Sequence, residues 1–195
     1  QRDIRIIRLD IDNITREDYS IMLLSSSFYR QFYGEKLLIY QEDTIILKQL
    51  DSHFLQYDYI GAPFSNREIG NGGLSLRSKS IMIQICEKYF DLYKKQLEKS
   101  AELLNRYKSK IQAKYGNTYY NNKALYFFYK IEENLLEDLQ ITNKMRQYKI
   151  GKLPSFPIGT LFSIEKYYNE KAFGGHQFWY CIDDVSSWLD RKLRY

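Results

Sequence analysis

Two pairs of acidic residues stand where a divalent cation could bind. Asp10-Ile11-Asp12 follows a strand-like stretch at 4–9, and Glu42-Asp43 follows another at 36–40. Ligands of open α/β sheets bind beyond the carboxyl ends of strands, and Mg²⁺ or Mn²⁺ prefers carboxylate and phosphate oxygens. Each pair is therefore a candidate metal site or, alternatively, a solvated turn. The second pair is favoured, because the unbroken apolar run before it is typical of a central strand covered on both faces.

His176 is one of only two histidines in the chain, and two glycines precede it directly. Glycines permit unusual backbone angles and a close approach of a ligand, and imidazole is a common metal ligand. Trp179 follows three residues later. His176 is thus either a metal ligand or a histidine packed against aromatic rings.

Two further motifs offer polar groups to a substrate. Asn71-Gly72-Gly73 lacks the Lys-Ser/Thr of a P-loop, but its backbone amides can approach a ligand and the Asn71 amide can bond a sugar hydroxyl. A plain turn is the alternative. Glu137-Asp138 lies in a helical pattern and can supply a general base, or it can be an ordinary pair on a helix surface. The sequence contains no Gly-x-Ser-x-Gly motif, and neither cysteine has a protease signature.

These groups must be positioned by alternating strands and helices, which predicts an α/β fold. Thr15 and Asp18 form a predicted capping box that opens a helix. Strand patterns occur at 4–9, 36–40, 44–47, 54–62 and 74–76, helical patterns at 15–32, 78–115 and 123–143, and an extended segment with two prolines at 150–160.

The composition fits one domain over residues 1–195 and excludes several classes of protein. The 195 residues are 44% hydrophobic and include 19 Tyr and 11 Phe, enough to form a core, so intrinsic disorder is excluded. The net charge of +5 is too mild to indicate a nucleic-acid partner. No apolar run reaches the ~20 residues of a membrane helix and no signal peptide opens the chain, which predicts a soluble, cytoplasmic protein. Cys86 is expected to be a buried thiol.

Five motifs in order resemble a single family. They are Leu-Leu-Ile-Tyr-Gln-Glu-Asp-Thr (37–44), Tyr-Asp-Tyr-Ile-Gly-Ala-Pro-Phe (57–64), Gly-Asn-Gly-Gly-Leu-Ser-Leu-Arg (70–77), Glu-Asp (137–138) and Phe-Gly-Gly-His-Gln-Phe-Trp (173–179). The set resembles a small group of predicted GT-A-type glycosyltransferases, catalogued as a domain of unknown function and found in viruses and microbes. The resemblance implies a Rossmann-like mixed sheet flanked by helices.

The resemblance also implies an activity: metal-dependent, inverting transfer of a sugar from a nucleoside-diphosphate donor, with a UDP-sugar favoured, to a hydroxyl of a glycan, protein or small molecule. Mn²⁺, or Mg²⁺, is the implied cofactor. The site residues that it assigns, or that adjoin its motifs, are Asp43, Glu42 and His176 for the metal, Asn71, Gly72, Gly73, Gln41, Phe64 and Trp179 for the substrate, and Asp138 and Glu137 for catalysis.

The chain departs from the family pattern at three places. Phe64 replaces the usual Trp, and Leu139, Gln140 and Ile141 follow the acid pair where the family has aromatic residues. Little chain precedes Tyr19, so the strand and loop that hold the nucleotide base are expected to be incomplete, and the chain is expected to be a fragment. The alternative function is a non-catalytic carbohydrate-binding or scaffold domain derived from a transferase.

Overall fold

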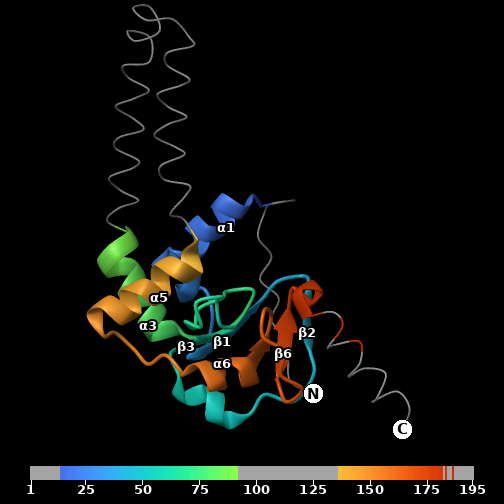
Figure 1. Cartoon of the computed structure of the whole chain (residues 1–195). Helices are drawn as coiled ribbons and strands as arrows, with labels where there is room; N and C mark the ends of the chain where they lie inside the picture. The colour runs from blue at the N-terminus through green and yellow to red at the C-terminus, as the bar shows by residue number, and fades with distance from the viewer. Residues whose placement is uncertain (1–13, 92–135, 182, 184–185, 187–195) are drawn as a thin grey trace, which may run out of the picture.

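The computed structural model describes residues 14–91 and 136–181, together with Asp183 and Ser186. Within these residues the fold is mixed α/β, with two three-stranded sheets (Figure 1). The predicted strand at 4–9, the acid pair Asp10-Asp12 and most of the two helical patterns at 78–115 and 123–143 lie outside the described residues.

Sheet A is antiparallel and has the strand order β1-β4-β3. Its strands are β1 (Lys36–Tyr40), β3 (Tyr59–Gly61) and β4 (Leu74–Ser78). All five residues of β4 are buried, because this central strand has a layer on each face. Leu74 and Leu76 pack against Phe162 and Phe173 on one face, while Ser75 and Arg77 alternate with them and point to the other.

Four helices cover the Arg77 face of sheet A (Figure 1). They are α1 (Arg16–Leu23), α2 (Ser26–Arg30), α3 (Lys79–Ile85), which continues into a π-helical turn η2 (Cys86–Phe90), and α5 (Glu137–Tyr148). The core here contains Tyr29, Tyr59, Met82, Ile85 and Cys86. Cys86 is a free, fully buried thiol, as predicted.

The opposite face of sheet A packs against η1 (Ser52–Gln56), a 3₁₀ helix, and α6 (Phe156–Phe162). Sheet B has the order β2-β6-β5 and consists of β2 (Thr44–Ile46), β5 (Ser163–Ile164) and β6 (Gly174–His176). The β2 strand is antiparallel to β6, and β5 is parallel to it. A last 3₁₀ helix, η3 (Phe178–Cys181), closes a small third core with Ile164.

Several expected elements differ from those observed. The helix predicted at 15–32 is two helices with a break at Leu24–Ser25, although the Thr15 cap is confirmed: its hydroxyl accepts from the Asp18 amide and donates to the Asp18 carboxylate. The strand predicted at 54–62 begins only at Tyr59, after η1, and the extended segment at 150–160 contains the start of α6.

The prediction that β1 is a central strand covered on both faces is wrong for the described residues. It is the end strand of sheet A, and Leu38 and Tyr40 are 38% and 67% exposed. Its other side chains, Leu37 and Ile39, pack toward the helices. An apolar run of strand length therefore reflects one buried face here, not two.

Each helix in the described part of the chain is too short or too polar to span a lipid bilayer.

Candidate functional site

The candidate site lies where the two sheets meet. The chain leaves sheet A at Tyr40 and enters sheet B at Thr44, so Gln41, Glu42 and Asp43 form the crossing. The Gly72-Gly73 loop lies against this crossing, since the Gly73 carbonyl accepts from the Gln41 amide at 2.8 Å and from the Thr44 hydroxyl at 3.2 Å. The glycine loop and the acid motif, 30 residues apart in sequence, are thereby held together.

Asp43 and His176 lie side by side at neighbouring strands of sheet B. Thr44 pairs with His176 in the β2–β6 ladder, which places Asp43 beside the imidazole. The distance from Asp43 Oδ1 to His176 Nε2 is 3.9 Å. Both atoms, and His176 Nδ1 as well, are buried and have no hydrogen-bond partner within the described residues. Burial lowers the pKa of His176 against the opposing effect of Asp43, so the imidazole is neutral at pH 7 and has a free nitrogen to coordinate a cation.

The donors present fit a cation only in part. Ligand atoms about 2.0–2.2 Å from one ion are at most about 4.4 Å apart, so the separation of Asp43 Oδ1 and His176 Nε2 suits a shared ion. No three His, Cys, Asp or Glu side chains converge on such a position among residues 14–91 and 136–181. A cation here would need further oxygen ligands from a substrate or water. Glu42, predicted as a third ligand, is exposed on the crossing segment.

The acid pair Glu137-Asp138 opens α5 and reaches the glycine loop. Asp138 Oδ2 accepts from the Gly72 amide at 3.0 Å, and Glu137 pairs with Arg77 at 2.9 Å. Burial and the neighbouring charge of Glu137 raise the pKa of Asp138 to about 6. A carboxyl group with such a pKa can exchange protons near neutral pH. The pair therefore packs against the glycine loop and Arg77 and is not an exposed pair on a helix surface.

Arg77 is a fully buried cation that the sequence analysis did not single out. Its guanidinium bonds Glu137, Ser75 Oγ at 2.9 Å and the Tyr29 hydroxyl at 3.2 Å, and it lies 4.7 Å from the centre of the Tyr59 ring. These partners come from two strands and two helices. Arg77 thus fixes α5, and with it Asp138, against sheet A.

The predicted substrate residues are divided between the site and its surroundings. Asn71 holds the loop internally, because its side-chain oxygen accepts from the Gly73 amide at 2.9 Å. Gln41 lies beside the hydroxyl of Tyr19, whose pKa is raised mainly by burial. Phe64 packs half-buried beside Gly70, and Trp179 is 58% exposed in η3. The ring of Tyr59 is fully buried against the Arg77 guanidinium.

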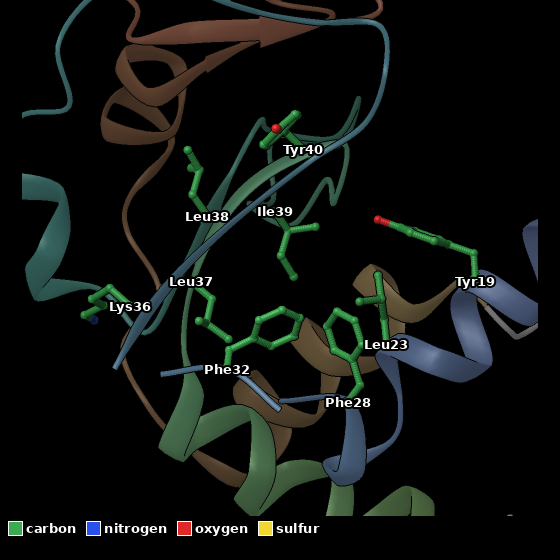
Figure 2. A pocket seen from close by; sticks show the side chains of 9 residues that line it. All are labelled: Tyr19, Leu23, Phe28, Phe32, Lys36, Leu37, Leu38, Ile39 and Tyr40. Carbon is green, nitrogen blue, oxygen red and sulfur yellow. The ribbon is translucent and has the colours of Figure 1, made fainter. Parts of the chain in front are cut away.

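An apolar cavity of about 360 Å³ adjoins the site along β1. Figure 2 shows its lining, in which the rings of Tyr19, Phe28 and Phe32 from the α1–α2 region lie on the side of β1 toward which Leu37 and Ile39 point. Among the described residues of that lining, Lys36 is the one that carries a charge. Tyr19, a residue of this lining, is hydrogen-bonded to the Gln41 side chain and lies within electrostatic reach of Asp138.

Replacement of Gly73 by Ala is expected to destabilise the fold by roughly 1–3 kcal/mol, because the added Cβ would overlap the His176 ring. Urea unfolding of Gly73→Ala would measure this cost. In the double variant Gly73→Ala/His176→Ala the ring is gone, so the Gly73→Ala cost should largely disappear. An equal cost with and without the ring would show that the overlap is not its cause.

The comparisons with known proteins identify a family. No curated protein and no solved structure matches the chain. A family model described as "Protein of unknown function (DUF5672)" matches residues 3–176, which include every site residue named above except Trp179. The chain therefore belongs to the DUF5672 family.

Proposed function

We propose that this domain has a GT-A-like fold and transfers a sugar from a nucleoside-diphosphate donor to an acceptor hydroxyl with the help of Mn²⁺ or Mg²⁺. The proposal rests on two buried atoms that could bind a metal ion, Asp43 Oδ1 and His176 Nε2. Neither atom has a hydrogen-bond partner within the described residues, and both lie beside a loop of two glycines. Buried polar atoms normally have partners, and a cation would satisfy both. When bound, the cation would neutralise charge on the diphosphate as it leaves.

Two protein donors suit a cation that is shared with a substrate. Hard divalent cations take oxygen ligands and commonly bind through one or two protein groups plus substrate phosphates. Asp43 and His176 would hold one side of the ion, and the diphosphate oxygens would complete it. This division of ligands favours a nucleoside-diphosphate sugar over an uncharged sugar as the first substrate.

Asp138 is the proposed base. Its carboxylate takes the proton of the acceptor hydroxyl while that oxygen forms a bond to the anomeric carbon and the bond from this carbon to the donor phosphate breaks. Attack from the face opposite the leaving diphosphate inverts the anomeric configuration. Glu137 acts by positioning Asp138, since its own carboxylate is paired with Arg77.

The apolar cavity along β1 is the proposed place for the nucleotide base. It contacts the polar site through Tyr19, and Tyr40 offers an exposed ring at the end of β1. Aromatic rings stack on any base with little dependence on its identity. Comparison of UDP and GDP with pyrophosphate would therefore separate the contribution of the base from that of the diphosphate.

Calorimetry with UDP, GDP and UDP-sugars, with and without Mn²⁺, tests the proposal. We expect nucleotide binding that requires the metal and weakens at least ~10-fold in Asp43→Asn, because the amide is a poorer ligand than a carboxylate. Glu87→Gln, an exposed acid paired with Arg30, is the matched control and should bind like the wild type. Absence of binding to every nucleotide would contradict the proposal, and binding of free sugars alone would support the non-catalytic carbohydrate-binding alternative.

A further inference from the structure

Glu165 is a buried carboxyl group that none of the motifs included. Glu165 is the residue directly after β5 and is 4% exposed. Its Oε2 atom has no hydrogen-bond partner within the described residues. A buried polar atom without a partner costs free energy that the fold alone does not recover. Such an atom points to a ligand that supplies the partner.

The register of sheet B places Glu165 next to His176. Ile164 pairs with Gly175 in the parallel β5–β6 ladder, so the following residues, Glu165 and His176, are neighbours one step along. Side chains alternate between the faces of a sheet. A Cβ at Gly175 would meet Phe178 and Ile164, so these residues share the outer face. His176 therefore lies on the inner face, where a Cβ at Gly73 would meet its ring, and we infer that Glu165, in the bend directly after β5, continues the alternation onto the same face.

The electrostatics of Glu165 agree with this placement. Burial raises its pKa to about 7, and the carboxylates of Asp138 and Asp43 add to the effect while Lys166 opposes it. Glu165 therefore lies within electrostatic reach of both the proposed base and the proposed metal ligand. A carboxyl oxygen can accept a hydrogen bond from a sugar hydroxyl group.

We propose that Glu165 is a sugar-binding residue of this site, whose Oε2 hydrogen-bonds a hydroxyl group of the donor sugar or of a sugar acceptor. The assignment rests on the proposed transferase function. The cation is a less suitable partner for Oε2, because no third donor converges with Asp43 and His176 in the described part of the chain. The donor sugar and a sugar acceptor would both offer Glu165 a hydroxyl group. Substitution of Glu165 distinguishes them, because it would weaken donor affinity in one case and raise the KM for the acceptor in the other.

The test compares Glu165→Gln and Glu165→Leu with the wild type in calorimetry and in steady-state kinetics. UDP–Mn²⁺ affinity should stay within about twofold, because neither the diphosphate nor the cation loses a contact. Glu165→Leu should weaken one sugar about tenfold, the usual effect of one lost hydrogen bond to a ligand. The weakened quantity would be UDP-sugar affinity if the donor is bound and acceptor KM if the acceptor is bound. Glu165→Gln should retain part of the interaction.

Thermal unfolding distinguishes a ligand-binding role of Glu165 from a structural one. If Glu165 stabilised the fold, its replacement by Gln would lower the unfolding midpoint; a ligand-binding role predicts that the midpoint rises. Because the pKa of Glu165 is raised in the fold, its ionisation destabilises the wild type as pH rises from about 4.5 through 7. Glu165→Gln should therefore raise the unfolding midpoint at pH 8 by roughly 2–8 °C and leave it unchanged near pH 4.

Three results would overturn the proposal. Unchanged affinity for both sugars in Glu165→Gln and Glu165→Leu would remove the sugar contact. An equal loss of UDP–Mn²⁺ binding would make Glu165 a metal ligand instead. A wild type that binds no nucleotide would refute the transferase function and this assignment together, so the two failures are distinguishable.

Discussion

The Arg77→Met variant is expected to lose about 3–5 kcal/mol of folding free energy, the largest stability effect of any substitution considered. Arg77 is fully buried, and its removal leaves the carboxylate of Glu137 inside the protein without its cation. Loss of one partner from a buried ion pair costs this much because the remaining charge is neither solvated nor compensated. The Tyr29 hydroxyl and Ser75 also lose a donor. Urea unfolding would measure the change.

Two further variants make the Arg77 prediction specific. Arg77→Met/Glu137→Leu removes both charges and should recover most of the loss, since apolar pairs of similar volume replace buried ion pairs at little cost. Arg30→Met removes an ion pair whose side chains are half-exposed, and it should change stability by less than about 1 kcal/mol. A double variant as unstable as Arg77→Met would show that the stranded charge is not the cause.

The Asp138→Asn variant is expected to lower sugar transfer about 10²–10⁴-fold with little change in donor affinity. The loss follows from removal of the proposed base, and general-base catalysis contributes rate factors of this size. The fold should persist, because the amide oxygen of Asn can still accept from the Gly72 amide that Asp138 binds at 3.0 Å. Measurement of kcat and of donor affinity by calorimetry separates chemistry from binding.

The pH dependence provides an independent check on Asp138. A base must be ionised, so wild-type kcat/KM should rise with pH through about 6, the raised pKa of this carboxyl group. The same raised pKa means that ionisation of Asp138 destabilises the fold as pH rises from about 4 through 6, so Asp138→Asn should be no less stable than the wild type at pH 8. Unchanged turnover in Asp138→Asn would assign the proton transfer to another group.

Much of the local structure near the site was predictable from the sequence. The cap at Thr15, the strand at Leu74–Ser78 and the acid motif after Lys36–Tyr40 each have a local cause: a side chain bonded to a nearby amide, or a short apolar run with turn residues beside it. The resemblance to a family also named residues far apart in sequence that the structure brings together, among them Asp43 and His176.

The remaining features depend on tertiary packing. Arg77 alternates with Leu74 and Leu76, a pattern typical of a strand with one solvated face, yet it is fully buried between sheet A and the helices that supply Tyr29 and Glu137. Glu165 is a single acid next to Lys166 with no motif around it, and only the register of sheet B brings it to His176. The position of β1 at the end of sheet A also depends on tertiary packing. An apolar run does not indicate whether neighbouring elements cover one face of a strand or both.

At the crossing Gln41–Asp43, a bound ligand of the proposed kind would stabilise the junction between the two sheets. This short segment and the Gly73 carbonyl that binds it join sheet A to sheet B at the site, and Leu74 of β4 packs beside Gly174 of β6 as well. Asp43 and His176 both belong to the sheet B side. A molecule that they hold and that also contacts the Gly72-Gly73 loop before β4 would bind only when both sheets are in place, so its binding free energy would add to the cooperativity of unfolding. At 100 times its dissociation constant such a ligand contributes about 2.7 kcal/mol. Ligand concentration would then set how often the two sheets separate.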